Sequence, residues 1–209
     1  MNAQTASADS GSINHLANNH YFDHTFQLEA VKLMPGEYFA TSSNIVLVTV
    51  LGSCVSACIR DRDKGIGGMN HFMLAEDESN AAVNAASARY GAFAMEVLVN
   101  HLLRLGARRG SLEAQVFGGG RVMASLATSK VGEQNARFVL DYLKTEGIPV
   151  TKQDLLDVYP RKVYFFPNNG RVLVRKLVRH HNDTLVKREL EYAARLTGIP
   201  GSGDIKPFT

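Results

Sequence analysis

The 209-residue chain lacks the features that mark secreted, membrane-spanning or disordered proteins. Its two cysteines are too few for a disulfide-rich secreted scaffold. Its N-terminus, MNAQTASADSGSINHLANNH, contains no apolar run that would serve as a signal peptide. Charged residues make up an ordinary 21% and the formal net charge is only +3, so neither a disordered chain nor a nucleic-acid-binding protein is indicated. We therefore expect a soluble, cytoplasmic protein.

The stretch between Tyr38 and Ile59 lacks charge altogether and is as long as a membrane-spanning helix. Polar or small residues recur throughout it, which a spanning helix disfavours: Ser42, Ser43, Asn44, Thr49, Gly52, Ser53 and Ser56. Two buried strands explain the stretch better. We expect no membrane insertion.

An apolar content of 45% is enough for one hydrophobic core, and no internal repeat divides the chain. Residues 1–24 are small and polar and are predicted to be disordered. Residues 25–182 carry the strand and helix patterns of a folded domain. Residues 183–209 are predicted to form a C-terminal helix and a loose tail, appended to that domain.

Apolar spacing predicts both strands and helices. The β-branched run at 44–51 is typical of a strand buried on both faces. Residues 54–61 alternate, with Val55, Ala57 and Ile59 on one face, and 66–74 follow as a third strand. Helical spacing spans 90–105 and 136–143, and Asn169-Gly170 marks a hairpin turn. Strands joined by short turns, with helices between others, predict an α+β fold.

Residues 51–74, LGSCVSACIRDRDKGIGGMNHFML, hold both cysteines and a histidine within predicted strands. Cys54 and Cys58 would lie about 13 Å apart on one strand, beyond the roughly 7 Å at which a disulfide closes. They would not converge with His71 on one zinc ion either, so we expect no metal site. Downstream, Gly118–Gly120 lacks the Lys-Ser/Thr of a phosphate loop and fits a close backbone approach at a strand end.

The same stretch carries the parts of a nucleophilic cysteine site. A cysteine attacks as the thiolate, and a nearby imidazole takes its proton and later protonates the leaving group. A short hairpin would bring His71 beside Cys54. Gly52 and Ser53 would allow a tight turn that aims backbone N–H groups at an oxyanion. Spacing alone leaves open the alternative that Cys54 and His71 are ordinary buried core residues, and it assigns Cys58 to the core.

The piece LGSCVSACIRD, followed by GGMNHFML, closely resembles the CheD family, the chemoreceptor glutamine deamidases of bacterial chemotaxis. The segments FGGGRVM, VGEQNARFVLDYL and RKVYFFPNNGRVLVRKL extend the resemblance over about residues 26 to 180. The resemblance implies an α/β sandwich within the α+β class, in which mixed β-sheets form a central sandwich flanked by helices.

Carried over to this chain, the resemblance implies that Cys54 is the nucleophile and His71 the catalytic histidine. Thr49 is the candidate third residue, and an ordinary β-branched strand former is the open alternative for it. The candidate substrate or oxyanion residues are Gly52, Ser53 and Asn70.

The resemblance also implies a reaction. Cys54 would attack the side-chain amide of receptor glutamines, ammonia would leave to give a thioester, and water would release glutamate. Neither a metal nor an organic cofactor is implied. Two alternatives remain: a receptor glutamyl methylesterase with the same dyad, and a non-catalytic adaptor that binds receptors and a CheC-type phosphatase. Since Cys54 and His71 are both present, the enzyme is favoured.

Charge placement fits an acidic helical partner. Eight Lys or Arg and a single Asp lie between Arg161 and Arg188. The glutamate-rich cytoplasmic helices that the resemblance implies as partners would be attracted to this stretch. A solvated hairpin and helix surface is the alternative. No recognition motif or aromatic platform accompanies the charge, so nucleic acid is not an expected partner.

Overall fold

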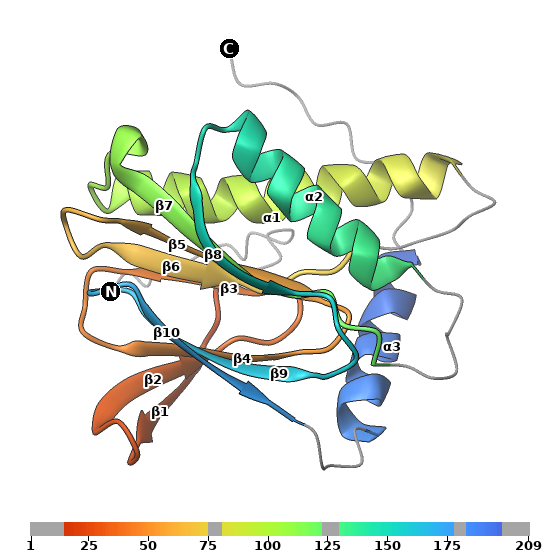
Figure 1. Cartoon of the computed structure of the whole chain (residues 1–209), viewed down its shortest axis with the longest axis horizontal. Coiled ribbons are helices and arrows are strands. Elements are labelled where there is room, and N and C mark those ends of the chain that lie inside the picture. Colours follow the sequence, from red (N-terminus) through yellow and green to blue (C-terminus); the bar gives the residue numbers. More distant parts are fainter. Residues whose placement is uncertain (1–14, 75–80, 123–129, 178–182, 198–209) are drawn as a thin grey trace, which may run out of the picture.

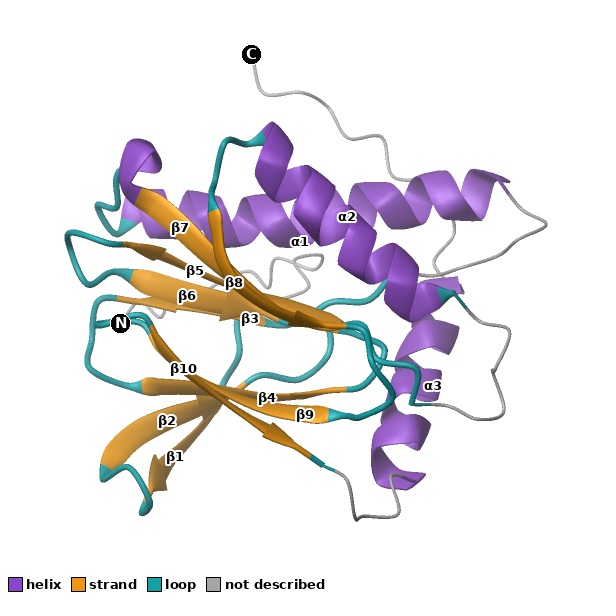
Figure 2. Ribbon diagram, viewed as in Figure 1, coloured by secondary structure: helices purple, strands orange, loops and turns teal. Residues whose placement is uncertain are grey.

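The computed structural model describes residues 15–74, 81–122, 130–177 and 183–197, which form stacked layers (Figures 1 and 2). The strands are β1 (Asn19–Asp23), β2 (Leu28–Lys32), β3 (Tyr38–Thr41), β4 (Val46–Leu51), β5 (Val55–Asp61), β6 (Gly67–Asn70), β7 (Leu112–Gly118), β8 (Val150–Leu155), β9 (Arg161–Phe166) and β10 (Arg171–Lys176). The helices are α1 (Ala81–Arg104), α2 (Val131–Thr145) and α3 (Asp183–Thr197), with a 3₁₀ turn at Arg109–Ser111.

Two mixed sheets, each of five strands within the described residues, are stacked face to face. The helix-covered sheet has the order β3-β6-β5-β7-β8, with β7 and β8 parallel. The outer sheet has the order β1-β2-β4-β9-β10, with β2 and β4 parallel. Helices α1 and α2 cover one face of the first sheet, while α3 stands across one end of the sandwich (Figure 1). The predicted α+β sandwich is confirmed.

The central core lies between the two sheets, and a second core lies between the helix-covered sheet and its helices. The central core is built from Leu47, Leu51, Cys54, Cys58, Met69, Met73, Phe117, Val163 and Phe165. The second contains Val55, Ala57, Ile59, Phe72, Met95, Leu98, Leu102, Val116 and Val139. Each fully buried Leu, Phe or Met stabilises the fold by about 1.5–3 kcal/mol. The two cores therefore hold the strands that carry the candidate site in a fixed relation.

Most elements follow the pattern of their sequence. Strand β4 is buried on both faces, β5 alternates between the two cores, and β9 and β10 form the hairpin at Asn169-Gly170, as predicted. Helix α1 begins earlier than its apolar spacing indicated, at Ala81. Gly106 follows its end with φ +99°, a backbone conformation that glycine adopts without strain.

Strands β1 and β8 lie where no strand was predicted. The disorder expected for residues 1–24 is wrong for 19–23, which form β1 and pair with β2. Leu16 also bridges to Tyr38. Strand β8 was not predicted, because its residues, VTKQDL, are polar and largely exposed and show no alternation of apolar residues. No helix in the described part of the chain is long and apolar enough to cross a membrane.

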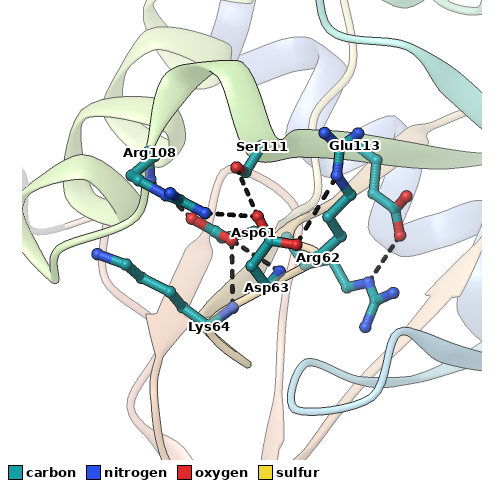
Figure 3. A network of polar contacts seen from close by, with 8 residues as sticks. Asp61, Arg62, Asp63, Lys64, Arg108, Ser111 and Glu113 are labelled. Carbon is teal, nitrogen blue, oxygen red and sulfur yellow. Dashed lines mark hydrogen bonds and ion pairs between the residues drawn. The ribbon is translucent and has the colours of Figure 1, made fainter.

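The turn between β5 and β6 is fixed by the buried carboxylate of Asp61 (Figure 3). Its Oδ1 accepts the N–H groups of Asp63 at 2.8 Å and Lys64 at 3.2 Å, and its Oδ2 accepts the N–H of Arg108 at 2.8 Å. The Arg108 guanidinium and the Ser111 hydroxyl both donate to Asp63. Burial alone would raise the pKa of Asp61, but the N–H donors outweigh it and the pKa lies below its usual range.

Replacing Asp61 by asparagine is expected to lower the free energy of unfolding near neutral pH by about 1–3 kcal/mol, because a buried hydrogen-bonded carboxylate is lost. Since the folded pKa of Asp61 lies below the unfolded one, the unfolded state binds more protons at acid pH. The contribution is complete above the unfolded pKa and is lost as pH falls through the folded one. Urea melts of wild type and Asp61→Asn should therefore converge as the pH falls through the folded pKa of Asp61. A gap that stays constant with pH would contradict this account.

Candidate active site

The loop Gly52–Cys54 carries the chain from β4 in the outer sheet to β5 in the helix-covered sheet. Its three carbonyl groups are all hydrogen-bonded. The N–H of Gly120 donates to Gly52 at 2.8 Å, the N–H of Gly119 donates to Cys54 at 2.8 Å, and Asn135 Nδ2 donates to Ser53 at 2.8 Å. Because the three carbonyl groups are hydrogen-bonded on one side of the loop, its N–H groups point to the opposite side.

The run Gly118–Gly120 explains why the loop can be held so closely. A Cβ at Gly118 would lie 2.2 Å from the Cys54 carbonyl oxygen, and φ there is +111°. Only glycine permits both that distance and that backbone conformation. The prediction that these glycines allow a close backbone approach at a strand end is confirmed.

Strand pairing brings Cys54 and His71 to one face of the helix-covered sheet. Val55 is paired with Phe72, and β5 runs antiparallel to β6. Continuing this register places His71 one diagonal position from Cys54, facing the central core. Diagonal neighbours lie about 7–8 Å apart in a sheet, a separation that a cysteine and an imidazole can span with their side chains. Both residues are buried.

The imidazole of His71 is oriented from the opposite sheet. Thr49 on β4 places its Oγ1 2.7 Å from His71 Nδ1 and 2.9 Å from the carbonyl oxygen of Leu33. The single hydroxyl proton goes to the carbonyl, so Oγ1 accepts from Nδ1–H. This network leaves Nε2 unprotonated, and among the described residues that buried atom has no hydrogen-bond partner. Nε2 is therefore a buried nitrogen that can accept a proton.

The electrostatic surroundings keep both groups neutral. Burial, aided by the positive charge of Arg188, lowers the pKa of His71 to about 3, although its contact with Leu33 raises it. Burial also raises the pKa of the Cys54 thiol, and the negative charge of Glu189 raises it further. The pair is thus a thiol and a neutral imidazole.

The N–H groups of the loop Gly52–Cys54 converge on one carboxylate, that of Glu189 on α3. Glu189 Oε1 accepts the N–H of Gly52 at 2.9 Å and that of Cys54 at 3.3 Å. Oε2 accepts the N–H of Ser53 at 2.9 Å and its hydroxyl at 2.7 Å. The candidate oxyanion residues Gly52 and Ser53 thus bind a carboxylate with their backbone. A cluster of N–H donors next to a thiol is the arrangement that stabilises a tetrahedral oxyanion.

The expectation for Asn70 is wrong. Its Oδ1 accepts the N–H of Ala57 at 2.9 Å, and its Nδ2 donates to the carbonyl of Ala94 on α1 at 3.2 Å. Successive residues of an extended chain face opposite sides of the sheet. Asn70 therefore faces the helices, whereas His71 faces the central core. Asn70 fixes α1 on the sheet and takes no part in the site.

Two site residues were missed, Asn135 and Glu189. Asn135 on α2 is fully buried and joins two segments of the site: it donates to Ser53 and accepts the N–H of Leu74 at 2.7 Å. A lone asparagine early in an amphipathic helix, on its apolar side, is the signal that would have drawn attention to it. Glu189 lies likewise on the apolar side of the C-terminal helix, which was expected to be an appendage and instead contributes a buried carboxylate to the site.

Within the described ranges, no group of three or more His, Cys, Asp or Glu side chains is arranged to hold a metal ion. Both cysteines are free thiols. The chemistry that the described residues offer is that of a buried thiol, an oriented base and a set of backbone donors.

The chain is similar in sequence to a described protein family and to several curated proteins. The CheD family model, described as CheD chemotactic sensory transduction, matches residues 73–176. The probable chemoreceptor glutamine deamidase CheD 1 of Dechloromonas aromatica is 64% identical over 194 residues, which cover 93% of this chain and 96% of that protein. The probable chemoreceptor glutamine deamidase CheD of Methylobacillus flagellatus is 57% identical, over 92% of this chain and 96% of its own length. The probable chemoreceptor glutamine deamidase CheD 1 of Shewanella oneidensis is 56% identical, over 91% of this chain and 93% of its own length.

Proposed function

The chain belongs to the CheD family, and on that premise we propose that it is a cysteine-dependent deamidase that converts glutamine side chains of chemoreceptors to glutamate. One observation carries the proposal beyond family membership. The unpaired Nε2 of His71 lies on the same sheet face as Cys54, beside a loop whose N–H groups already bind a carboxylate. A deamidase needs these three parts: a nucleophile, a base and an oxyanion site.

In the first half of the reaction, Nε2 of His71 takes the proton of the Cys54 thiol, and Sγ attacks the side-chain amide carbon of the substrate glutamine. The carbonyl oxygen becomes an oxyanion that accepts N–H groups of the loop Gly52–Cys54. As the tetrahedral intermediate collapses, the carbon–nitrogen bond breaks, and the imidazolium proton leaves with the nitrogen as ammonia. A thioester on Cys54 remains.

In the second half, a water molecule attacks the thioester carbon while His71 accepts one of its protons. The carbon–sulfur bond breaks, the sulfur regains a proton from His71, and the side chain leaves as glutamate. Thr49 keeps His71 in the tautomer that is protonated at Nδ1. Its hydroxyl donates to the Leu33 carbonyl, so towards the imidazole it acts as the acceptor for Nδ1–H. This is the orienting role of the third member of a catalytic triad.

The proposed substrate sets the proposed location and partners. Chemoreceptor helices that carry the glutamines lie in the cytoplasm, so we place the protein there. Exposed basic residues of the hairpin and of α3 would attract glutamate-rich helices: Arg171, Arg175, Lys176, Lys187 and Arg195. Arg161 belongs to the sequence stretch but not to this surface, because it is buried and paired with Asp154 at 2.9 Å. A CheC-type phosphatase is proposed as a second partner.

The test is mass spectrometry of a chemoreceptor cytoplasmic fragment incubated with the full chain. Two fragments are compared, one with glutamine and one with glutamyl methyl ester at the modification sites. A deamidase converts the amide to the acid and releases ammonia, whereas a methylesterase acts on the ester and releases methanol. Conversion of specific glutamines supports the proposal. Ester hydrolysis alone would replace it by the esterase, and binding without either reaction would replace it by the adaptor.

A further inference from the structure

Glu189 makes an unusual set of contacts for a helix side chain. It is 1% exposed, and the four donors that bind its carboxylate all belong to the loop Gly52–Cys54. A buried carboxylate is costly unless it is fully hydrogen-bonded, and here both oxygens accept two donors each. The oxyanion site of the candidate nucleophile is therefore occupied by a residue of the same chain.

The occupant has the chemistry of the reaction product. A glutamine side chain that has been deamidated is a glutamate side chain, and Glu189 presents that group from a helix, as a chemoreceptor does. An amide oxygen in place of Oε1 would receive the N–H groups of Gly52 and Cys54. The amide nitrogen, in place of Oε2, would meet the Ser53 hydroxyl, which can accept a hydrogen bond, and the Ser53 N–H, which cannot. The loop therefore matches the product carboxylate better than the amide.

The space beside the loop is shaped to this side chain. A Cβ added to Gly52 would lie 2.7 Å from both carboxylate oxygens of Glu189 and 2.7 Å from Cγ2 of Val122, although the backbone there does not require glycine for its conformation. The absence of a side chain at position 52 therefore serves the approach of a carboxylate or amide to the N–H groups.

Helix α3 packs against the rest of the described structure through one face. Leu185 is buried, Tyr192 packs over Gly36, and the hydroxyls of Tyr192 and Tyr90 are hydrogen-bonded. With Glu189 these positions follow the i, i+4, i+7 spacing of a single helix face. The opposite face, which includes Lys187, Leu190, Glu191 and Arg195, is exposed. A second helix with a matching face would make the same contacts.

We propose that α3 is a tethered occupant of the substrate site, with Glu189 in the place of the product glutamate, and that a receptor helix binds by displacing it. The proposal rests on the proposed function and adds the orientation of the substrate: a helix lying across the end of the sandwich, with its glutamine pointing at Cys54. Glu189 also covers the Cys54 thiol and raises its pKa. In the absence of a receptor, the enzyme therefore exposes no reactive cysteine.

The deciding experiment turns the occupant into a substrate. In Glu189→Gln, the introduced amide is expected to be hydrolysed to the acid by Cys54, with one water consumed and one ammonia released per chain. Peptide mass spectrometry over time reads the conversion at position 189. The amide should persist in Glu189→Gln combined with Cys54→Ser. It should also persist in Glu191→Gln, the matched control, whose side chain lies on the exposed face of the same helix.

The two proposals fail in different ways. Persistence of the amide in Glu189→Gln, while receptor glutamines are converted by wild type, overturns the occupancy proposal and leaves the deamidase standing. Conversion at position 189 without conversion of any receptor upholds the occupancy proposal and overturns the receptor assignment. Persistence in Glu189→Gln together with inactivity on every receptor overturns both.

A second variant covers the case in which Glu189→Gln does not fold. Glu189→Ala removes the occupant, so alkylation of Cys54 by iodoacetamide should become at least about 10-fold faster if the site was closed nine-tenths of the time or more. The KM for a receptor fragment should fall, because the fragment no longer competes with the Glu189 side chain for the loop Gly52–Cys54. A residue with only a structural role would give a lower thermal midpoint without either effect, and that outcome overturns the proposal.

Discussion

Cys54→Ser is expected to reduce glutamine deamidation by on the order of 10⁴-fold or more, because the attacking atom of the proposed mechanism is lost. A serine hydroxyl at this position has a far higher pKa than a thiol, and the neutral imidazole of His71 is too weak a base to ionise it in a site built for a thiol. The measurement is the rate of glutamine-to-glutamate conversion in a receptor fragment. Ammonia release gives the same rate independently.

The matched control is Cys58→Ala, four residues along the chain. Cys58 is equally buried in the central core, so its removal tests the loss of a core thiol without touching the proposed chemistry. We expect Cys58→Ala to lower the thermal midpoint and to retain activity within a few-fold. Equal loss in both variants would assign the effect of Cys54→Ser to packing, and the nucleophile would have to be sought elsewhere.

His71→Gln is expected to lower kcat by about 10²–10⁴-fold, the usual contribution of a positioned general acid–base. Glutamine keeps a polar group near Thr49 but cannot take the thiol proton or return it to ammonia. The pKa of His71 is lowered to about 3, so the wild-type imidazole is in its proton-accepting form at neutral pH. The pH profile of kcat/KM, which reports the free enzyme, should therefore show no loss between about pH 8 and pH 5 from protonation of His71.

Thr49 supplies the control for the orientation of the ring. Thr49→Val keeps the shape of the side chain and removes the acceptor for Nδ1–H, and we expect a loss of about 10-fold, equivalent to one hydrogen bond. Thr49→Ser, which retains the hydroxyl, should restore most of the rate. If Thr49→Val were fully active, the threonine would be an ordinary β-branched strand residue, the alternative that its sequence context left open.

The sequence predicted those parts of the fold that are determined by neighbours along the chain. Strand β4 has a continuous β-branched run, β5 alternates strictly, and the Asn169-Gly170 turn has its own backbone chemistry. Strand β1 depends on pairing with β2, and β8 is held by its pairing with β7. Neither has an apolar pattern strong enough to reveal it in isolation.

The candidate site divides in the same way. Cys54 directly precedes β5 and His71 directly follows β6, and these two strands are adjacent in sequence, so a hairpin was enough to predict their proximity. The error at Asn70 was avoidable, because alternation along β6 cannot turn two successive side chains to the same face. Glu189 could not be predicted, because it meets the Gly52–Cys54 loop across 135 or more residues of chain, a contact that only the packing of α3 creates.

The attachment of α3 to the chain has a consequence for where the protein can act. An intramolecular competitor is present at a fixed effective concentration, about millimolar for a short connection, and dilution of the protein does not change it. A glutamine-bearing helix that is scarce in the cell competes poorly against such a tether. Receptor helices would win the exchange where their own local concentration reaches a comparable value. Selectivity would then come from crowding of the target as much as from its sequence, and stray cytoplasmic helices would be spared.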